Sequence, residues 1–391
     1  MIEFEEALDV VMKSAFSTGT ETISFSDSLN RVLADDITSD MDLPPFNKAT
    51  VDGFACREAD LGVELEIIET IPAGKYPEKI IMADQCSRIM TGAAIPDGSD
   101  MVFMVEDSHI LPSGKVKCTV PFTKTNISAK GEDVKTGDTV LKRGKMIKPQ
   151  DIAVMAAVGC TSVVAGKMPV VAIISSGDEL VEPAEKPGIS QIRNINASLL
   201  MAQIQRAGAS GRYYGIARDN EEDTFNIINL AISENDIVLI SGGVSTGDFD
   251  FIPAVLERAG VSILFSGVNV QPGKPTTFGT HPDALVFGLP GNPVSSFIQF
   301  ELLVRPLICK MMGHQWEPLT IDLPVSETFN RRNADRMAFL PVVITGDGSV
   351  SPVEYHGSAH ISAMALADGI IAIPVGKKSI EKGEIVNVRQ V

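Results

Sequence analysis

Apolar runs alternate with helix-periodic segments between residues 168 and 317. The runs VVAII (170–174) and DIVLI (236–240) have the length and branched side chains of buried strands. Segments 197–208 and 223–232 repeat apolar residues at helical spacing, and a glycine ends the first of them. Alternating strands and helices imply right-handed βαβ units. This region therefore predicts a doubly wound α/β domain with a mainly parallel sheet.

The flanking regions show other patterns. Residues 1–41 begin as a helix, and residues 148–164 look helical and then strand-like. Residues 56–140 hold short apolar runs separated by turn signals such as PAG and PDG, which predicts a β-rich domain. The tail, 318–391, returns to strands and turns, so we expect a small β-barrel there.

Polar loops, four of which contain glycine, follow five expected strands. If these strands are parallel, their loops converge on one rim of the sheet, where backbone N–H groups and helix dipoles bind anions. A single glycine turn after a strand is usually only a turn, but five at one rim favour a ligand site. The loops are SSGDEL (175–180), RDN (218–220), SGGVSTGDFD (241–250), QPGKPTT (271–277) and LPGNPVSS (289–296).

The acidic side chains of these loops have two interpretations. Carboxylates beside phosphate-binding loops suit a hard cation such as Mg²⁺ that bridges them to the ligand. Alternatively, Asp178 or Asp219 is the N-cap of a following helix. The acidic residues are Asp178, Glu179, Asp219, Asp248 and Asp250.

Three further loop residues suit an anion site. Lys274 lies between a glycine and a proline and could contact a phosphate or oxyanion, although most lysines are solvated surface. Pro293 fits the first turn of the last long helix, with Asn292 as its cap, and this structural role is compatible with ligand binding.

Composition restricts the class of protein. The 391 residues exceed one ordinary domain. A net charge of −17 argues against nucleic acid and anionic membranes as partners. Five cysteines without a CxxC pair, and an N-terminus without a signal-peptide pattern, indicate a cytoplasmic protein. Walker, GxGxxG, nucleophile-elbow and histidine metal motifs are missing.

Taken together, the motifs resemble those of the molybdopterin molybdenumtransferase (MoeA) family. The first are DLPPFNKATVDGFA (42–55), RIMTGAAIPDGSDMVFMVED (88–107) and KGEDVKTGD (130–138). The glycine-rich loops follow in the family order, and then come ADRMAFLP (334–341) and GSAHISAMALADGIIAIP (357–374). The resemblance spans nearly the whole chain, so the combined pattern is specific.

This resemblance implies an elongated homodimer of four-domain subunits. Residues 1–41 and 134–167 would form a segmented linker domain, with a β-rich domain of residues 42–133 inserted into it. Residues 168–317 would form a molybdopterin-binding α/β domain like the adenylyltransferase MogA, and residues 318–391 a C-terminal β-barrel. The active site would lie between the α/β domain of one subunit and the inserted and C-terminal parts of the other.

The implied reaction takes adenylylated molybdopterin and molybdate, hydrolyses the adenylate, releases AMP and inserts molybdenum into the dithiolene. A separate adenylyltransferase and molybdoenzyme acceptors are the further partners that it implies. By analogy with the family, Glu179, Asp219 and Asp250 hold Mg²⁺ and are catalytic together with Asp52, Thr91 and Asp133. The expected substrate-binding residues are Ser241, Gly242, Gly243, Ser245, Gly273, Lys274, Pro290, Gly291, Asn292, Pro293, Arg336 and Ser362.

The chain departs from the family pattern at two places. Gln271 precedes PGKP where many relatives have lysine, which removes one cation from the anion site. Ala49 or a shifted Thr50 replaces a serine often found in the first motif. Two other functions stay open: a molybdopterin adenylyltransferase and a non-enzymatic scaffold like the related domain of gephyrin. The insert and the barrel favour the transferase, and the set Asp52, Thr91, Asp219 and Asp250 favours catalysis.

Overall fold

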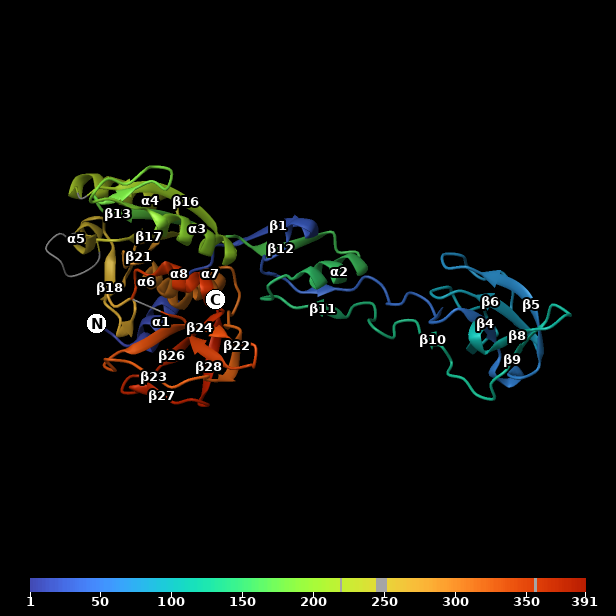
Figure 1. Cartoon of the computed structure of the whole chain (residues 1–391). Coiled ribbons are helices and arrows are strands. Elements are labelled where there is room, and N and C mark those ends of the chain that lie inside the picture. The colour runs from blue at the N-terminus through green and yellow to red at the C-terminus, as the bar shows by residue number, and fades with distance from the viewer. Residues whose placement is uncertain (219, 244–251, 355–356) are drawn as a thin grey trace. The chain divides into compact units, whose positions relative to one another are not determined.

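The computed structural model describes all residues except 219, 244–251 and 355–356. Contacts divide the chain into two compact units (Figure 1). No helix among the described residues is long and apolar enough to cross a membrane. The first unit comprises Met1–Ala34, Gly144–Ile147 and Val163–Val391, and the second comprises Asp35–Arg143 and Lys148–Ser162.

A six-stranded sheet organises the α/β part of the first unit. The first four strands in the order below are parallel neighbours, whereas β20 runs antiparallel to the strands on both sides of it. The mainly parallel sheet predicted from the sequence is therefore confirmed. The order is β16 (Ser210–Ala217), β13 (Val170–Ser176), β17 (Ile237–Ser241), β21 (Leu285–Leu289), β20 (Thr277–Thr280) and β18 (Ser262–Ser266).

One of the five expected strands lies outside this sheet. The segment VNV at 268–270 leads into β19 (Val270–Gln271), which pairs with β24 (Met337–Ile344) of the C-terminal sheet. The expectation that five loops follow five parallel strands of one sheet is therefore wrong for 271–277. This loop instead leads into the antiparallel strand β20, whose first residue pairs with Gly288 near the end of β21.

Side chains alternate between the two faces of the α/β sheet, as strands buried on both sides require. Val171 and Ile173 belong to one core, and Ala172 and Ile174 belong to the other. The first core includes helices α1 (Phe4–Lys13), α3 (Ile195–Arg206), α6 (Pro293–Gln299) and α7 (Arg305–Met311). The second includes α4 (Glu221–Glu234) and α5 (Ile252–Arg258), so helices cover both faces, as predicted.

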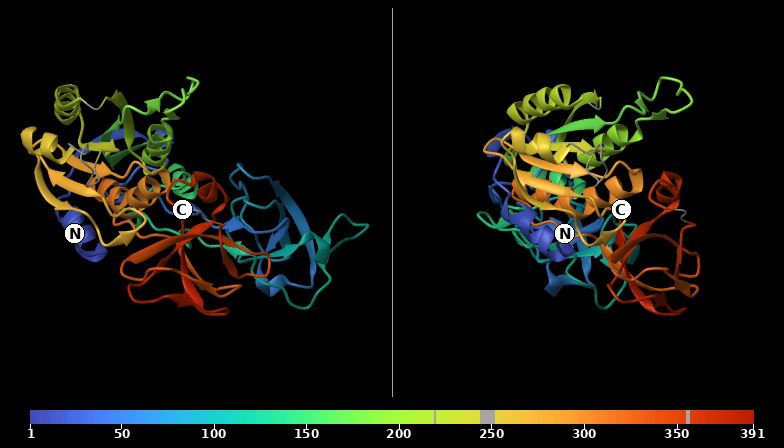
Figure 2. Two further views of the ribbon diagram at one scale, coloured as in Figure 1. Left: turned by 60° about the vertical axis from the view of Figure 1, so that its left-hand side comes forward. Right: turned by 90° about the vertical axis from the view of Figure 1, so that its left-hand side faces the viewer.

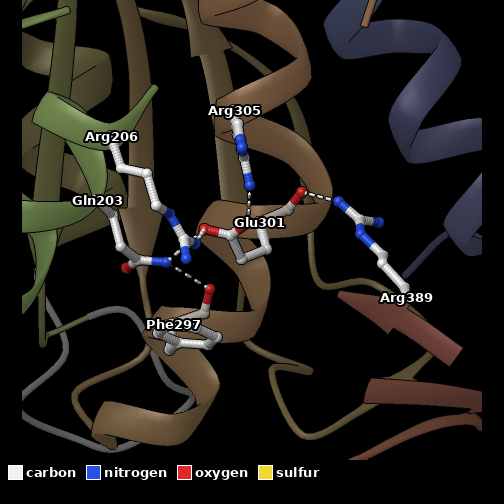
Figure 3. Close-up of polar contacts among 6 residues, drawn as sticks. All are labelled: Gln203, Arg206, Phe297, Glu301, Arg305 and Arg389. Carbon is white, nitrogen blue, oxygen red and sulfur yellow. Dashed lines mark hydrogen bonds and ion pairs between the residues drawn. The ribbon is translucent and has the colours of Figure 1, made fainter. Parts of the chain in front are cut away.

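A π-helical turn, η4 (Phe300–Val304), lies between α6 and α7. Pro306 has no N–H. It therefore cannot donate a hydrogen bond to the carbonyl of Leu302, four residues before it, or to that of Glu301, five residues before it. The Arg305 N–H donates to the carbonyl five residues before it. The Glu301 carbonyl is thus left without a helical donor, and the Arg389 guanidinium donates to it instead (Figure 3).

The Glu301 carboxylate is fully buried and joins two helices (Figure 3). On α3, Gln203 Nε2 and Arg206 Nη2 donate to Glu301 Oε1 over 2.9 and 2.5 Å. On α7, Arg305 Nη1 donates to Glu301 Oε2 over 2.9 Å. A buried carboxylate with this set of donors meets the requirement that buried charges be paired and hydrogen-bonded.

The C-terminal strands form a closed barrel, and Figure 2 shows the curvature of these red strands. A bridge from Val325, just after β22, back to Val350 in β25 closes the ring. The C-terminal β-barrel predicted from the sequence is therefore confirmed. The strands pair in the order β25 (Val350–Pro352), β24, β26 (Gly369–Ile373), β28 (Ile385–Gln390) and β22 (Thr320–Pro324), and β23 (Phe329–Asn330) pairs with β27 (Ser379–Ile380).

Trp316 connects the barrel to the helices of the α/β part. The guanidinium carbons of Arg389, on β28, and Arg305, on α7, lie 4.8 and 5.0 Å from the centre of its ring. Burial lowers the pKa of Arg389 to about 10, so this group stays charged at neutral pH.

The second unit contains the predicted β-rich domain. The rings of Phe54 and Phe103 stack 5.3 Å apart in its core. Its six-stranded sheet has the order β7 (Met101–Met104), β4 (Gly53–Cys56), β6 (Gln85–Ile89), β5 (Glu64–Ile71), β9 (Val116–Cys118) and β8 (Ser108–Ile110). The unit also contains the pairs β2 (Ile37–Thr38) with β11 (Thr139–Leu141) and β3 (Lys48–Ala49) with β10 (Ile127–Ser128), and helix α2 (Pro149–Ala157).

The N-terminal residues pack with the first unit. Helix α1 buries Ala7 and Val11 in the core that contains α3 and α7. Strand β1 (Thr20–Ser24) pairs with β12 (Ser162–Gly166). Contacts thus separate two units, and the finer division into four domains with boundaries at 41, 133, 167 and 317 stays a prediction.

Candidate functional site

A pocket of about 930 Å³ lies at the carboxyl ends of β13, β17 and β21. This is the rim at which ligands bind in doubly wound sheets. Eight of the expected site residues line it. The lining residues are Ser176, Gly177, Glu179, Leu180, Pro187, Gln191–Asn196, Ser241, Gly242, Gly243, Pro275, Pro290, Gly291, Asn292, Pro293 and Ala359.

The loop after β17 approaches its neighbours so closely that it requires glycine. Gly242 has a φ of +98°, and a Cβ there would lie 2.4 Å from the carbonyl oxygen of Ser176. Its N–H donates to Leu289 O over 3.0 Å, which joins this loop to the end of β21. At Gly243, a Cβ would lie 2.7 Å from Ile252. The backbone therefore forms this wall of the pocket.

The loop after β21 begins helix α6. Pro293 occupies the first turn, as predicted, and Ser296 Oγ donates to Pro290 O over 2.5 Å. Asn292 is the N-cap residue, but its side chain makes no capping hydrogen bond. Asn292 Nδ2 instead donates to Ser358 Oγ over 2.8 Å, so the expected capping role of its side chain is wrong. This contact brings the C-terminal segment that contains Ala359 to the pocket.

The loop after β13 contributes Glu179, which is exposed and lines the pocket. Asp178 precedes a short strand, β14 (Leu180–Val181), that pairs with β15 (Ile192–Arg193), so Asp178 does not cap a helix. The N-cap of α4 is Asn220, whose Oδ1 accepts the N–H groups of the second and third helical residues, Glu222 and Asp223, over 3.0 and 3.1 Å. Asp178 is therefore not a helix cap, and Asn220 occupies the N-cap position of α4.

Gly273 and Lys274 lie beside the pocket wall. Lys274 is exposed and does not line the pocket, although its neighbour Pro275 does. A Cβ at Gly273 would lie 2.3 Å from Gln299 Nε2, and that nitrogen donates to Pro272 O over 3.3 Å. Gln299 on α6 thus positions the PGKP turn, and sequence reasoning missed this residue.

Two expected binding residues of the C-terminal part do not line the pocket. Arg336 Nη1 donates to Val270 O over 3.4 Å, beside the pairing of β19 with β24. Ser362 is exposed on the short helix α8 (Ile361–Leu366).

Asp52 and Thr91, in the second unit, lie together as the family resemblance implies. Thr91 donates to Asp52 Oδ1 from its N–H over 2.7 Å and from its hydroxyl over 2.6 Å. These two bonds, with the side-chain bond the larger cause, hold the pKa of Asp52 below its ordinary value. The carboxylate is exposed and ionised at neutral pH. The next residue, Gly53, is required because a Cβ there would lie 2.0 Å from Phe103 O.

Asp133 is exposed in the loop that returns from the β-rich domain. Its N–H donates to Leu43 O over 3.0 Å. Close to it, Asp42 Oδ1 accepts the N–H and the hydroxyl of Thr136 over 2.9 and 3.0 Å, and Lys130 Nζ lies 3.5 Å from Asp42 Oδ2. These contacts hold the segments 42–44 and 130–136, which lead into and out of the β-rich domain, against each other.

Three expected site residues, Asp219, Ser245 and Asp250, lie outside the described residues, as does Asp248. Within the described part of the chain, no group of three or more His, Cys, Asp or Glu side chains could hold a metal ion. Glu179 is therefore the one member of the expected Mg²⁺ set whose position is described.

The fold and the pocket define a class of protein: a multidomain protein with a ligand-binding, doubly wound α/β domain. Residues 172–310 match a family model described as a probable molybdopterin-binding domain. Residues 2–159 match the MoeA N-terminal region (domains I and II), and residues 328–391 match the MoeA C-terminal region (domain IV). The chain belongs to the MoeA family.

Full-length relatives agree with this assignment. The molybdopterin molybdenumtransferase of Staphylococcus epidermidis is 36% identical over 99% of this chain and 95% of its own length. That of Bacillus subtilis is 35% identical over 99% of this chain and 93% of its own length. A crystal structure of a MoeA protein from Pyrococcus horikoshii, 32% identical, superposes with a TM-score of 0.81 over 100% of this chain and 99% of that chain.

Proposed function

We propose that this chain is a molybdopterin molybdenumtransferase, which inserts molybdenum into molybdopterin during molybdenum cofactor synthesis. The observation that carries this proposal is the pocket of glycine loops, which lies in the segment matched by the molybdopterin-binding domain model. The relatives matched along their whole length carry this enzyme name, which disfavours the adenylyltransferase and the scaffold.

The substrate in this proposal is adenylylated molybdopterin, and molybdate is the second substrate. The backbone at Gly243 and Gly291, which lines the pocket, suits the phosphate and pterin oxygens, because glycine turns let a ligand approach the backbone closely. Water cleaves the phosphoric anhydride and AMP leaves, while the dithiolene sulfurs replace oxygen bound to the molybdenum of molybdate, which departs as water on protonation. Lys274 and Arg336 supply positive charge for molybdate in an otherwise acidic chain.

We assign the Mg²⁺ ligands to Glu179, Asp219 and Asp250. Carboxylate oxygens are the donors that this hard cation prefers, and Glu179 already faces the pocket. Bound Mg²⁺ would neutralise charge on the phosphate oxygens. Asp52, kept ionised by Thr91, suits the orientation of a water molecule or a cation, and Asp133 is a further acidic group assigned to catalysis.

The homodimer, the adenylyltransferase that supplies the substrate and the molybdoenzymes that receive the product follow from the family resemblance and belong to the same proposal. Ser245 and Ser362 complete the proposed substrate-binding set. The cytoplasmic location and the four-domain boundaries also stay predictions.

The test is release of AMP from adenylylated molybdopterin by the purified chain with Mg²⁺, with and without molybdate. We expect AMP release that depends on molybdate and yields a molybdenum-bearing product. Glu179→Gln should abolish release, whereas Glu185→Gln, an exposed residue six positions on that does not line the pocket, should not. Tight binding of the adenylate without turnover would indicate a binding protein and contradict the enzyme.

A further inference from the structure

Asn196, in the first turn of α3, bridges the two glycine loops of the pocket. Its Nδ2 donates to Ser241 Oγ over 2.6 Å and to the carbonyl oxygen of Gly291 over 2.8 Å. Ser241 is the last residue of β17, and Gly291 lies in the loop that follows β21. Asn196 is 8% exposed and lines the pocket, so this fork is held inside the wall.

The orientation of the Asn196 carboxamide follows from the chemistry of its partners. A carbonyl oxygen only accepts hydrogen bonds, so the NH₂ group must face Gly291 O. Asn196 Oδ1 is consequently turned away from both loops, and it is buried without a hydrogen-bond partner among the described residues. An unmatched buried acceptor costs free energy, which offsets part of what the two hydrogen bonds of Asn196 Nδ2 contribute.

The bond to Gly291 O also orients the peptide group between Gly291 and Asn292. The C=O and N–H of a trans peptide point in opposite directions in one plane. With the carbonyl fixed on Asn196, the Asn292 N–H points away from α3. Glycine turns have wide conformational freedom, so without such a brace this peptide could rotate.

We propose that Asn196 is a positioning residue, which holds the Ser241–Gly243 and Pro290–Asn292 loops in the arrangement that binds molybdopterin. The inference rests on the proposed function, because it names the ligand of that pocket. Among the residues that the structure describes, the backbone bond from Gly242 N–H to Leu289 O also joins these loops, and the Asn196 fork adds a side-chain brace. Loops that are already braced before the ligand arrives lose less conformational freedom on binding, which improves affinity.

Asn235, near the opposite end of β17, offers a matched control. Asn235 lies just before β17, at the end opposite to Ser241. Its Nδ2 donates to Ala231 O over 2.7 Å and to the hydroxyl of Tyr214 over 2.8 Å. Asn235 is 6% exposed, and its Oδ1 is buried without a partner among the described residues. The two asparagines thus share their bonding pattern and burial but lie at opposite ends of the strand.

The experiment compares Asn196→Asp with Asn235→Asp by thermal unfolding and by anaerobic titration with molybdopterin. Both substitutions place a carboxylate against a carbonyl oxygen, so we expect similar losses of stability. Asn196→Asp alone should weaken binding, by about tenfold or more at pH 8, as the loss of one buried hydrogen bond implies. Because a protonated carboxyl donates one hydrogen bond, its affinity should recover as the pH is lowered.

The outcomes separate the two proposals. Equal affinity of wild type, Asn196→Asp and Asn235→Asp at every pH would overturn the positioning role while leaving the transferase intact. Failure of the wild-type chain to bind molybdopterin would overturn the proposed function and, with it, the ligand named here. If Asn196→Asp does not fold, Asn196→Ser keeps one donor and should show intermediate affinity, whereas wild-type affinity would again refute the brace.

Discussion

Replacement of Glu301 by alanine tests whether the buried charge network holds the first unit together. Glu301 is fully buried, and its carboxylate accepts from Gln203, Arg206 and Arg305 (Figure 3). The variant keeps the π-helical turn, which depends on Pro306, but removes the acceptor from three donors at once. Arg305 is 21% exposed at its side chain, so water cannot fully replace the lost partner.

The expected magnitude follows from the burial. Removal of one partner from a buried ion pair typically destabilises a protein by about 3–5 kcal/mol, because it leaves an uncompensated charge. The pair Arg258–Glu222 provides a control, since its 2.8 Å separation matches the network but its side chains are 43% and 62% exposed. Glu222→Ala should therefore cost at most about 1 kcal/mol.

Trp316 makes the assay specific. It is the single tryptophan of the chain and lies against Arg305 and Arg389, so its fluorescence reports the network directly. Urea unfolding followed by this signal should show a much lower midpoint for Glu301→Ala than for Glu222→Ala, with unchanged slope. Equal shifts for the two variants would refute the argument that burial makes the Glu301 network strong.

Two other predictions concern the proposed site. Thr91→Val should raise the pKa of Asp52 towards its ordinary value, which a carboxyl NMR titration measures, and an unchanged midpoint would contradict the assigned cause. Since Asp52 has its lowered pKa in the folded chain, the stability from these bonds is present at neutral pH and is lost as the pH falls through that lowered value. Gly242→Ala, with its Cβ 2.4 Å from Ser176 O, should disrupt molybdopterin binding and lower the melting temperature. In Gly291→Ala, the added Cβ would lie 3.7 Å from Gly242 Cα, an ordinary contact, so the free energy of unfolding should change by less than about 1 kcal/mol. Equal losses of stability in Gly242→Ala and Gly291→Ala would refute the steric reasoning.

The α/β fold could be predicted because its signals are local. Strand runs such as 170–174 and helix-periodic segments such as 223–232 carry their own periodicity, and a parallel sheet follows from their alternation. Strand pairing is not local, which explains the error at 268–270. That segment has the composition of a strand, but its partner is β24, nearly 70 residues later.

The pocket was predicted from glycine loops, whereas the side chains that brace them were not. Asn196 and Gln299 belong to helices whose sequences give no sign that a carboxamide reaches another loop. An asparagine near a helix start usually indicates capping, and Asn194, two residues earlier, does cap α3. Only the packing of α3 against the ends of β17 and β21 distinguishes the roles of these two asparagines.

The π-helical turn is only partly predictable from the local sequence around Pro306. Pro306 by itself predicts that backbone carbonyls one turn earlier lose their N–H donor. The helix must then bend or widen, or these carbonyls must accept from another group. The sequence does not say which of these occurs, because the donor is Arg389, 88 residues away on the last barrel strand. The barrel and the helix therefore depend on each other: the barrel supplies the donor, and the widened helix turns its free carbonyl towards the barrel. The hydrogen bond that the helix lacks at Glu301 is replaced by a contact between the helix and the barrel, and this contact is visible only in the tertiary structure.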